Sequence, residues 1–246
     1  MIHEWPAWAG MAAAILAAYT VFGLTGFGSA VVGVPILAQF VPLTFAVPLV
    51  MLLDLVSTLA VGALNWRLVS RGELLRLVPF MAVGIYIGVT LLVNVEPRWL
   101  LMALGIFVLA NALWNLARRA PAEPVSAWWS APAGVAGGVF SALFGTGGPI
   151  YTTYLARRVD ASAFRATTVT IILMSGLIRL ATFAGNGLLF QAGLIAAWLW
   201  FLPVCALGVF LGSRLHARLP PAKVKQALFL LLAVSGVAVL ARSLTG

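Results

Sequence analysis

The chain contains six continuous apolar runs, each about as long as the helix that crosses a lipid bilayer. Such a helix needs about 20 mostly apolar residues. The runs cover residues 43–64, 74–93, 98–117, 165–185, 191–213 and 222–243. Only 9% of all residues are charged and 63% are apolar, whereas soluble domains carry about 25% charged residues. Because the runs do not alternate as barrel strands do, the sequence predicts an all-α polytopic membrane protein.

Two further apolar regions, 7–41 and 127–156, are interrupted by glycine-rich segments. The first is broken over 23–29 and again over 33–35, and the second is broken over 144–149. We expect each region to form a helix–loop–helix hairpin that enters and leaves the membrane on the same side.

The basic residues orient these segments. Twelve of the 15 Lys and Arg residues lie in four connections, two lie in the other connections and termini, and Arg179 lies inside a span. The four basic connections are 65–76, 117–126, 156–165 and 213–226. This partition arises only if each hairpin begins and ends on one side. Since Lys and Arg accumulate in cytoplasmic loops, both termini are expected to face outward. Basic residues spread over separate loops also argue against a nucleic-acid surface.

The two halves of the chain share a pattern of proline and glycine. Three residues recur 124 positions later, with Pro79, Gly84 and Gly88 matched by Pro203, Gly208 and Gly212. Each half has one hairpin and three crossings, and three is odd, so the halves are expected in opposite orientations. Such inverted-topology repeats are typical of secondary transporters. The alternative is a chance or purely structural duplication.

The predicted units are an N-terminal repeat at 1–117, a cytoplasmic linker at 118–126 and a C-terminal repeat at 127–246. In each repeat the two recurring glycines lie on one helix face. Glycines at this spacing allow close helix packing, and that role is preferred over chemistry.

The two glycine-rich breaks are predicted to form a binding site for a small anion. A helix that restarts after a break presents free N–H groups and the positive end of its dipole, and glycine allows a ligand to approach the backbone closely. Breaks from inverted halves that meet near the midplane would present Gly26, Phe27, Gly28, Ser29, Gly145, Thr146, Gly147, Gly148 and Pro149. The alternative is a pair of flexible kinks that bind nothing.

Two ionisable residues, Asp54 and Arg179, lie inside predicted spans. Charged groups at that depth are costly and usually face a cavity or a partner. Arg179 is predicted to bind the anion, because its planar guanidinium matches oxyanion geometry. Asp54 is the candidate carrier of a coupling proton. The alternative is that the two residues pair with each other and only brace the bundle.

Polar uncharged side chains follow the second break at Tyr151, Thr152, Thr153 and Tyr154, and Gln39 lies in the first hairpin. They either surround a pocket, with Thr152 as a substrate contact, or form hydrogen bonds between helices. No Walker A motif, metal-binding cluster or catalytic set occurs in the sequence. We therefore expect no ATPase or other enzyme activity, no metal and no cofactor.

These motifs resemble those of the sulfite exporter TauE/SafE family of bacterial inner-membrane proteins. The resemblance rests on Gly26-Phe27-Gly28-Ser29-x3-Gly33-Val34-Pro35, Gly145-Thr146-Gly147-Gly148-Pro149, Phe164-Arg165-Ala166-Thr167 and the repeated Pro-x4-Gly-x3-Gly. Ser29 departs from the pattern, because another glycine often stands there. The resemblance implies transport of small anions such as sulfite, sulfoacetate or other organosulfonates across the inner membrane.

We therefore predict a secondary anion transporter, an exporter, that works by alternating access around a midplane site. Its partners would be a small anionic substrate, the lipid bilayer and, if transport is coupled, a proton carried by Asp54. The alternatives are an anion channel and a membrane scaffold subunit that transports nothing.

Overall fold

The computed structural model describes residues 5–25, 28–61, 66–117 and 124–216. Within these ranges every regular element is a helix, as the apolar runs predicted. The α-helices are α1 (Trp5–Thr25), α2 (Ser29–Leu37), α3 (Leu43–Val61), α4 (Arg71–Asn94), α5 (Pro97–Ala117), α6 (Ser130–Phe144), α7 (Gly148–Leu155), α8 (Ala161–Gly185) and α9 (Leu194–His216). Short 3-10 turns are η1 (Trp66–Leu68), η2 (Ala127–Trp129) and η3 (Leu188–Phe190).

Five described helices are long and apolar enough to cross a membrane. The spanning segments are Ala7–Leu24, Leu43–Ala60, Arg71–Asn94, Ser162–Gly185 and Leu194–Leu215. Four of these coincide with predicted runs, in α3, α4, α8 and α9. The run 98–117 falls on α5, which is 21 residues long. The run 222–243 lies outside the described residues.

The outer faces of these helices carry large apolar side chains. Exposed examples on α3, α4 and α9 are Leu59, Leu75, Tyr86, Leu199 and Trp200. A water-soluble protein rarely exposes such an extended apolar surface. These faces are therefore suited to contact lipid.

Helices end and restart at two of the glycine-rich segments, as the sequence predicted. The chain leaves α1 at Thr25 and starts α2 at Ser29, and it leaves α6 at Phe144 and starts α7 at Gly148. The helices before the breaks differ, because α1 has 21 residues and α6 has 15. At 1.5 Å per residue, α1 is about as long as the hydrocarbon layer is thick, and α6 is shorter.

A further break predicted over 33–35 does not occur. Helix α2 continues through Gly33 and Pro35 to Leu37. A Cβ on Gly33 would lie 3.1 Å from the Cβ of Ala18 in α1. Gly33 therefore lets α2 pack closely against α1 rather than interrupting the helix.

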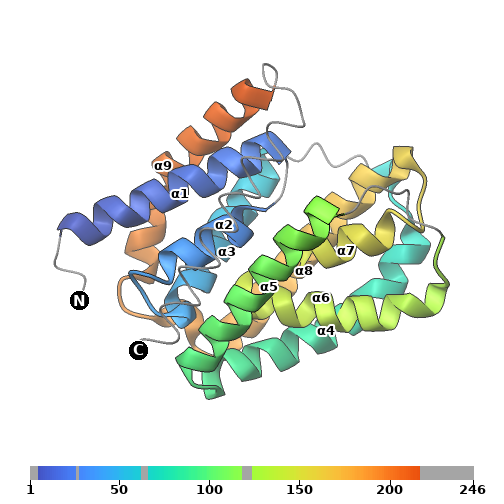
Figure 1. Ribbon diagram of the computed structural model, residues 1–246, viewed down its shortest axis with the longest axis horizontal. Helices are drawn as coiled ribbons and strands as arrows, with labels where there is room; N and C mark the ends of the chain where they lie inside the picture. Colours follow the sequence, from blue (N-terminus) through green and yellow to red (C-terminus); the bar gives the residue numbers. More distant parts are fainter. Residues whose placement is uncertain (1–4, 26–27, 62–65, 118–123, 217–246) are drawn as a thin grey trace.

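The most extensive helix contacts cross between the two halves of the chain. Helix α1 packs along α9, and α4 packs along α6. Figure 1 shows the α1–α9 pair on one side of the molecule and the α4–α6 pair on the other. Helices α2, α3, α7 and α8 connect these two pairs, through contacts that include α3 against α8 and α7 against α8.

The recurring glycines form the two seams, as the sequence predicted. On α4, a Cβ at Gly84 or Gly88 would collide with backbone carbonyls of α6. On α9, a Cβ at Gly208 or Gly212 would collide with backbone carbonyls of α1. Each seam is thus a backbone-to-backbone contact that only glycine permits.

Candidate functional site

The two helix breaks lie against each other. Gly28 precedes α2 with φ 93°, and Gly145 ends α6 with φ 70°. Glycine adopts such left-handed conformations without the steric penalty of other residues. A Cβ on Gly145 would lie 2.6 Å from the Cβ of Ala30 in α2. The expectation that the breaks meet therefore holds for the described residues, whereas Gly26 and Phe27 lie outside them.

A small cavity opens where the breaks meet. Its volume is about 40 Å³, and since one water needs roughly 10–15 Å³ by this measure, it holds about three waters. Its walls come from α1, α2, α3, α6, α7, α8 and the two breaks. The predicted site residues that line it are Gly28, Ser29, Asp54, Gly145, Gly148, Pro149 and Arg179.

Arg179 forms the basic wall of this cavity. Its side chain comes from α8 and is 4% exposed. The Nη1 atom donates a hydrogen bond of 3.1 Å to the carbonyl oxygen of Ser141, while the buried Nε has no hydrogen-bond partner among the residues that the structure describes. A buried guanidinium with an unused donor is costly in an apolar interior. The arrangement suits a ligand that accepts hydrogen bonds.

Asp54 forms the acidic wall. Its Oδ1 accepts hydrogen bonds from the Tyr19 hydroxyl at 2.8 Å and from the Ser29 hydroxyl at 2.6 Å. The Tyr19 hydroxyl also lies 3.1 Å from the carbonyl oxygen of Val50. Although Asp54 and Arg179 line one cavity, no ion pair within 4.0 Å joins them in the part of the chain that the structure describes. The two charges therefore border one cavity without a direct salt bridge.

Tyr151 is the other unsatisfied donor on the cavity wall. Its side chain is 1% exposed, and its hydroxyl makes no hydrogen bond with the described residues. Nearby, the hydroxyls of Ser141 and Ser175 lie 2.8 Å apart and both residues line the cavity. Of the two roles left open for the polar residues after the second break, Tyr151 has the pocket role.

The residues that follow Tyr151 form their side-chain hydrogen bonds away from the cavity. The hydroxyls of Thr152 and Thr153 both donate to the Pro149 carbonyl, at 3.1 and 2.8 Å. Gln39, in the turn after α2, donates to the carbonyl of Pro35 in that helix. Thr152 is therefore not a cavity residue, because its hydroxyl is bonded to a carbonyl in the preceding turn of α7.

Thr146 and Gly147 also lie away from the cavity. Thr146 is buried, with its hydroxyl 3.4 Å from the Phe140 carbonyl. A Cβ on Gly147 would lie 2.5 Å from the Gly137 carbonyl. The turn between α6 and α7 folds back on α6, so these two residues pack against that helix and do not face the first break.

Several lining residues were missed, although helical spacing could have found them. On α8, Ile172, Ser175 and Arg179 lie on one face at spacings of three and four. On α3, Thr58 lies one turn beyond Asp54. The positions one or two helical turns away from Asp54 and Arg179, on the same helix face, would have identified this wall. The remaining unpredicted lining residues are Phe22, Ala30, Val31 and Ser141.

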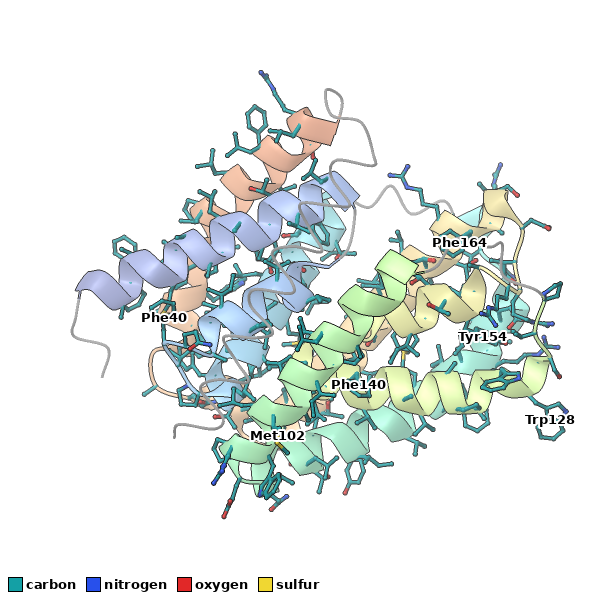
Figure 2. The ribbon with its side chains drawn as sticks, viewed as in Figure 1. Phe40, Met102, Trp128, Phe140, Tyr154 and Phe164 are labelled. Atoms are coloured by element: carbon teal, nitrogen blue, oxygen red, sulfur yellow. The ribbon has the colours of Figure 1, made fainter. Side chains whose placement is uncertain are left out.

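A second polar cluster lies on α4, away from the cavity, and is centred on Glu73. Glu73 is 4% exposed and accepts hydrogen bonds from the Tyr154 hydroxyl at 2.5 Å, from Arg158 at 2.8 Å and from Arg76 at 2.8 Å. These bonds to Glu73 raise the pKa of the Arg158 guanidinium. Figure 2 shows Tyr154 on α7 beside α4. The cluster joins α4 to the segment that follows α7.

The described residues contain no group of three or more His, Cys, Asp or Glu side chains that could hold a metal ion. The charged groups that line the cavity are one carboxylate, from α3, and one guanidinium, from α8.

Comparison with known proteins agrees with this architecture. The profile of the family described as "Sulfite exporter TauE/SafE" matches residues 11–239. A protein of Comamonas testosteroni, described as "Probable inner membrane transporter protein TsaS", is 32% identical over 191 residues, which cover 77% of this chain and 80% of the relative. No solved structure matches the chain closely enough for comparison.

The family match covers nearly the whole chain, including both breaks and all five described spans. Its members are named as transporters and not as enzymes. The helices, the apolar outer faces and this match together identify a multi-pass protein of the inner membrane. The chain belongs to the sulfite exporter TauE/SafE family of membrane transporters.

Proposed function

We propose that this protein is a secondary transporter that exports small anions and binds them in the cavity between the two breaks. The observation that carries the proposal is the Arg179 guanidinium, which is 4% exposed and has a buried Nε without a partner. A buried charge is strongly destabilising unless a partner compensates it. An anion in the cavity would supply that partner. The family name favours sulfite as the substrate.

The backbone around the cavity supports the same ligand charge. Helices α2 and α7 both begin at the cavity, at Ser29 and Gly148. The first turn of a helix has unpaired N–H groups and a partial positive charge. The contribution of α7 is small, because Pro149 has no N–H and the N–H groups of Ile150 and Tyr151 donate to the Gly147 carbonyl. The start of α2, the Arg179 guanidinium and the Tyr151 hydroxyl therefore supply the donors that favour an anion.

Alternating access would open this cavity to each side of the membrane in turn. The two glycine seams support an inverted-repeat arrangement, because α1 packs on α9 as α6 packs on α4, and these helices occupy corresponding positions in the two halves. Seams this close resist sliding, since backbone meets backbone. We therefore infer that the moving bodies are the α1–α9 pair and the α4–α6 pair, with the cavity between them.

Export of an anion needs no ATP in this scheme. An inside-negative potential favours the exit of one negative charge by about 2.3 kcal/mol per 100 mV, which is more than a tenfold concentration ratio. Uptake against that potential would need a coupling ion, for which Asp54 is the candidate proton carrier.

A flux assay in proteoliposomes tests the proposal. The purified protein should move at least one of sulfite, sulfoacetate, taurine and acetate faster than empty liposomes, and a pH gradient would change the rate only if a proton is coupled. Single-channel currents would instead indicate an anion channel. Failure to move any of these anions, with the protein correctly folded, would favour the scaffold alternative.

The predicted orientation has its own test. Topology reporters should place residues 118–126 in the cytoplasm and the C-terminus in the periplasm. A cytoplasmic C-terminus would contradict the inverted repeat without affecting the anion site.

A further inference from the structure

The cavity has two chemically opposite walls, and each has unused hydrogen-bonding capacity. On one wall, the buried Nε of Arg179 and the hydroxyl of Tyr151 are donors without partners among the described residues. On the other wall, both hydrogen bonds that reach Asp54 end on Oδ1, from Tyr19 and Ser29. Among the described residues, the Oδ2 atom of Asp54 accepts no hydrogen bond. The cavity therefore offers donors at one end and an acceptor at the other.

The two charges make no direct ion pair among the described residues. Arg179 and Asp54 both line the cavity, yet no ion pair within 4.0 Å connects them. The space between them, about 40 Å³, holds about three waters or a small molecule with complementary ends. A site with unpaired polar groups discriminates strongly against ligands that leave those groups unpaired.

We propose, resting on the proposed transport of anions, that the substrate is a small monoanion that carries a hydrogen-bond donor opposite its oxyanion group. The oxyanion binds Arg179 and Tyr151, and a hydroxyl, amino or ammonium group on the same molecule donates to Asp54. An anion with an apolar end leaves the Oδ2 atom of that carboxylate without a partner, although Tyr19 and Ser29 still donate to Oδ1. A dianion places its second charge against Asp54, where like charges repel.

Sulfamate and methanesulfonate are a matched pair of probes. Both are small monoanions with one sulfonyl group and the same number of non-hydrogen atoms, and they differ in an amino group against a methyl group. We expect sulfamate to compete for transport in proteoliposomes at about tenfold to a hundredfold lower concentration than methanesulfonate, the range for one unsatisfied buried group. This comparison uses the unmodified protein, so no variant has to fold.

Asp54→Asn tests the assignment of the acceptor. Asparagine retains an oxygen for Tyr19 and Ser29 but removes the negative charge. We expect the preference for sulfamate over methanesulfonate to fall to within about threefold, and sulfoacetate, a dianion, to gain relative to both. Thr58→Val is the matched control, because Thr58 lines the same cavity one turn away on α3 without a charge. It should change the affinity for both probes alike.

The outcomes separate this inference from the proposed function. Equal competition by sulfamate and methanesulfonate would overturn the donor requirement while the protein remained an anion transporter. An unchanged sulfamate preference in Asp54→Asn would overturn the role of Asp54. If the protein moves no anion at all, transport itself fails.

Discussion

The break between α1 and α2 and the break between α6 and α7 both turn at a glycine with positive φ, Gly28 and Gly145. Their surroundings differ. Ser29, which follows Gly28, donates a hydrogen bond to the Asp54 carboxylate. The polar side chain at this break therefore already has a partner within the protein. The second break lies near the Nε of Arg179 and the hydroxyl of Tyr151, which have no hydrogen-bond partner among the described residues. Similar backbone geometry therefore presents opposite charge at the two ends of one cavity.

This comparison teaches that repetition of a fold need not repeat its chemistry. The backbone of each half supplies a break followed by a short helix. The side chains around the break decide whether its polar groups form hydrogen bonds within the protein or are available to a ligand. If the second break is the substrate end, changes there should affect binding more than changes at the first. The following predictions test that difference, from the largest effect to the smallest.

Alanine substitutions at Gly28 and Gly145, the glycines with positive φ at the two breaks, should produce unequal losses of stability. A left-handed conformation costs an alanine about 1–2 kcal/mol, and this applies to both positions. Gly145→Ala also drives its new methyl to 2.6 Å from the Cβ of Ala30, which adds about 1–3 kcal/mol of overpacking. At Gly28 the nearest atom is 4.0 Å away. Thermal unfolding in detergent should therefore rank Gly145→Ala well below Gly28→Ala, and equal midpoints would contradict the close contact of the breaks.

Arg179→Gln should weaken anion binding by about tenfold to a hundredfold, because hydrogen bonds to a charged group contribute about 1.5–3 kcal/mol. Binding is measured by the anion concentration that half-saturates flux in proteoliposomes. Arg165→Gln is the control, since Arg165 is exposed near the start of the same helix. If both substitutions leave the half-saturating concentration unchanged, Arg179 is only a structural residue.

Adjacent glycines of the second break should separate packing from binding. Gly148 lines the cavity and has no atom within 4 Å of an added Cβ, whereas a Cβ on Gly147 would lie 2.5 Å from the Gly137 carbonyl. Gly148→Ala should fold normally and raise the half-saturating anion concentration about severalfold, because its methyl occupies the cavity. Gly147→Ala should lower the unfolding temperature. The reverse pattern would place the substrate elsewhere.

Ser29→Ala should have the smallest effect. It removes one of the two hydrogen bonds to Asp54, while Tyr19 retains the other. One such bond contributes about 0.5–1.5 kcal/mol, so the unfolding midpoint should fall slightly and anion affinity should stay within about threefold. A loss as large as that of Arg179→Gln would show that the first break also binds the substrate directly.

The sequence predicted those features that follow from local chemistry. The apolar runs located α3, α4, α8 and α9, the glycine clusters located both breaks, and the repeated glycines identified the seams. Asp54 and Arg179 were recognisable because a charge inside an apolar run is costly.

Features that depend on the direction of a side chain could not be predicted in the same way. Thr146, Gly147 and Thr152 lie within three residues of cavity residues in the sequence but face α6 or their own backbone. Composition cannot distinguish these neighbours, since the turn geometry after Gly145 decides which of them face the cavity. The role of Glu73 could likewise not be predicted, because its partners Tyr154 and Arg158 lie 81 and 85 residues away in the sequence.

The crossed seams also constrain how the protein is made. Helix α1 emerges first from the ribosome, but α9, the helix it packs against, is among the last described parts of the chain. Helix α4 has a shorter delay before α6. During synthesis, the glycine face of α4 and the small-residue face of α1 must therefore remain in the bilayer without their native partners. Assembly should finish only after α9 is inserted, so a truncation before α9 would leave α1 open to wrong partners and to degradation.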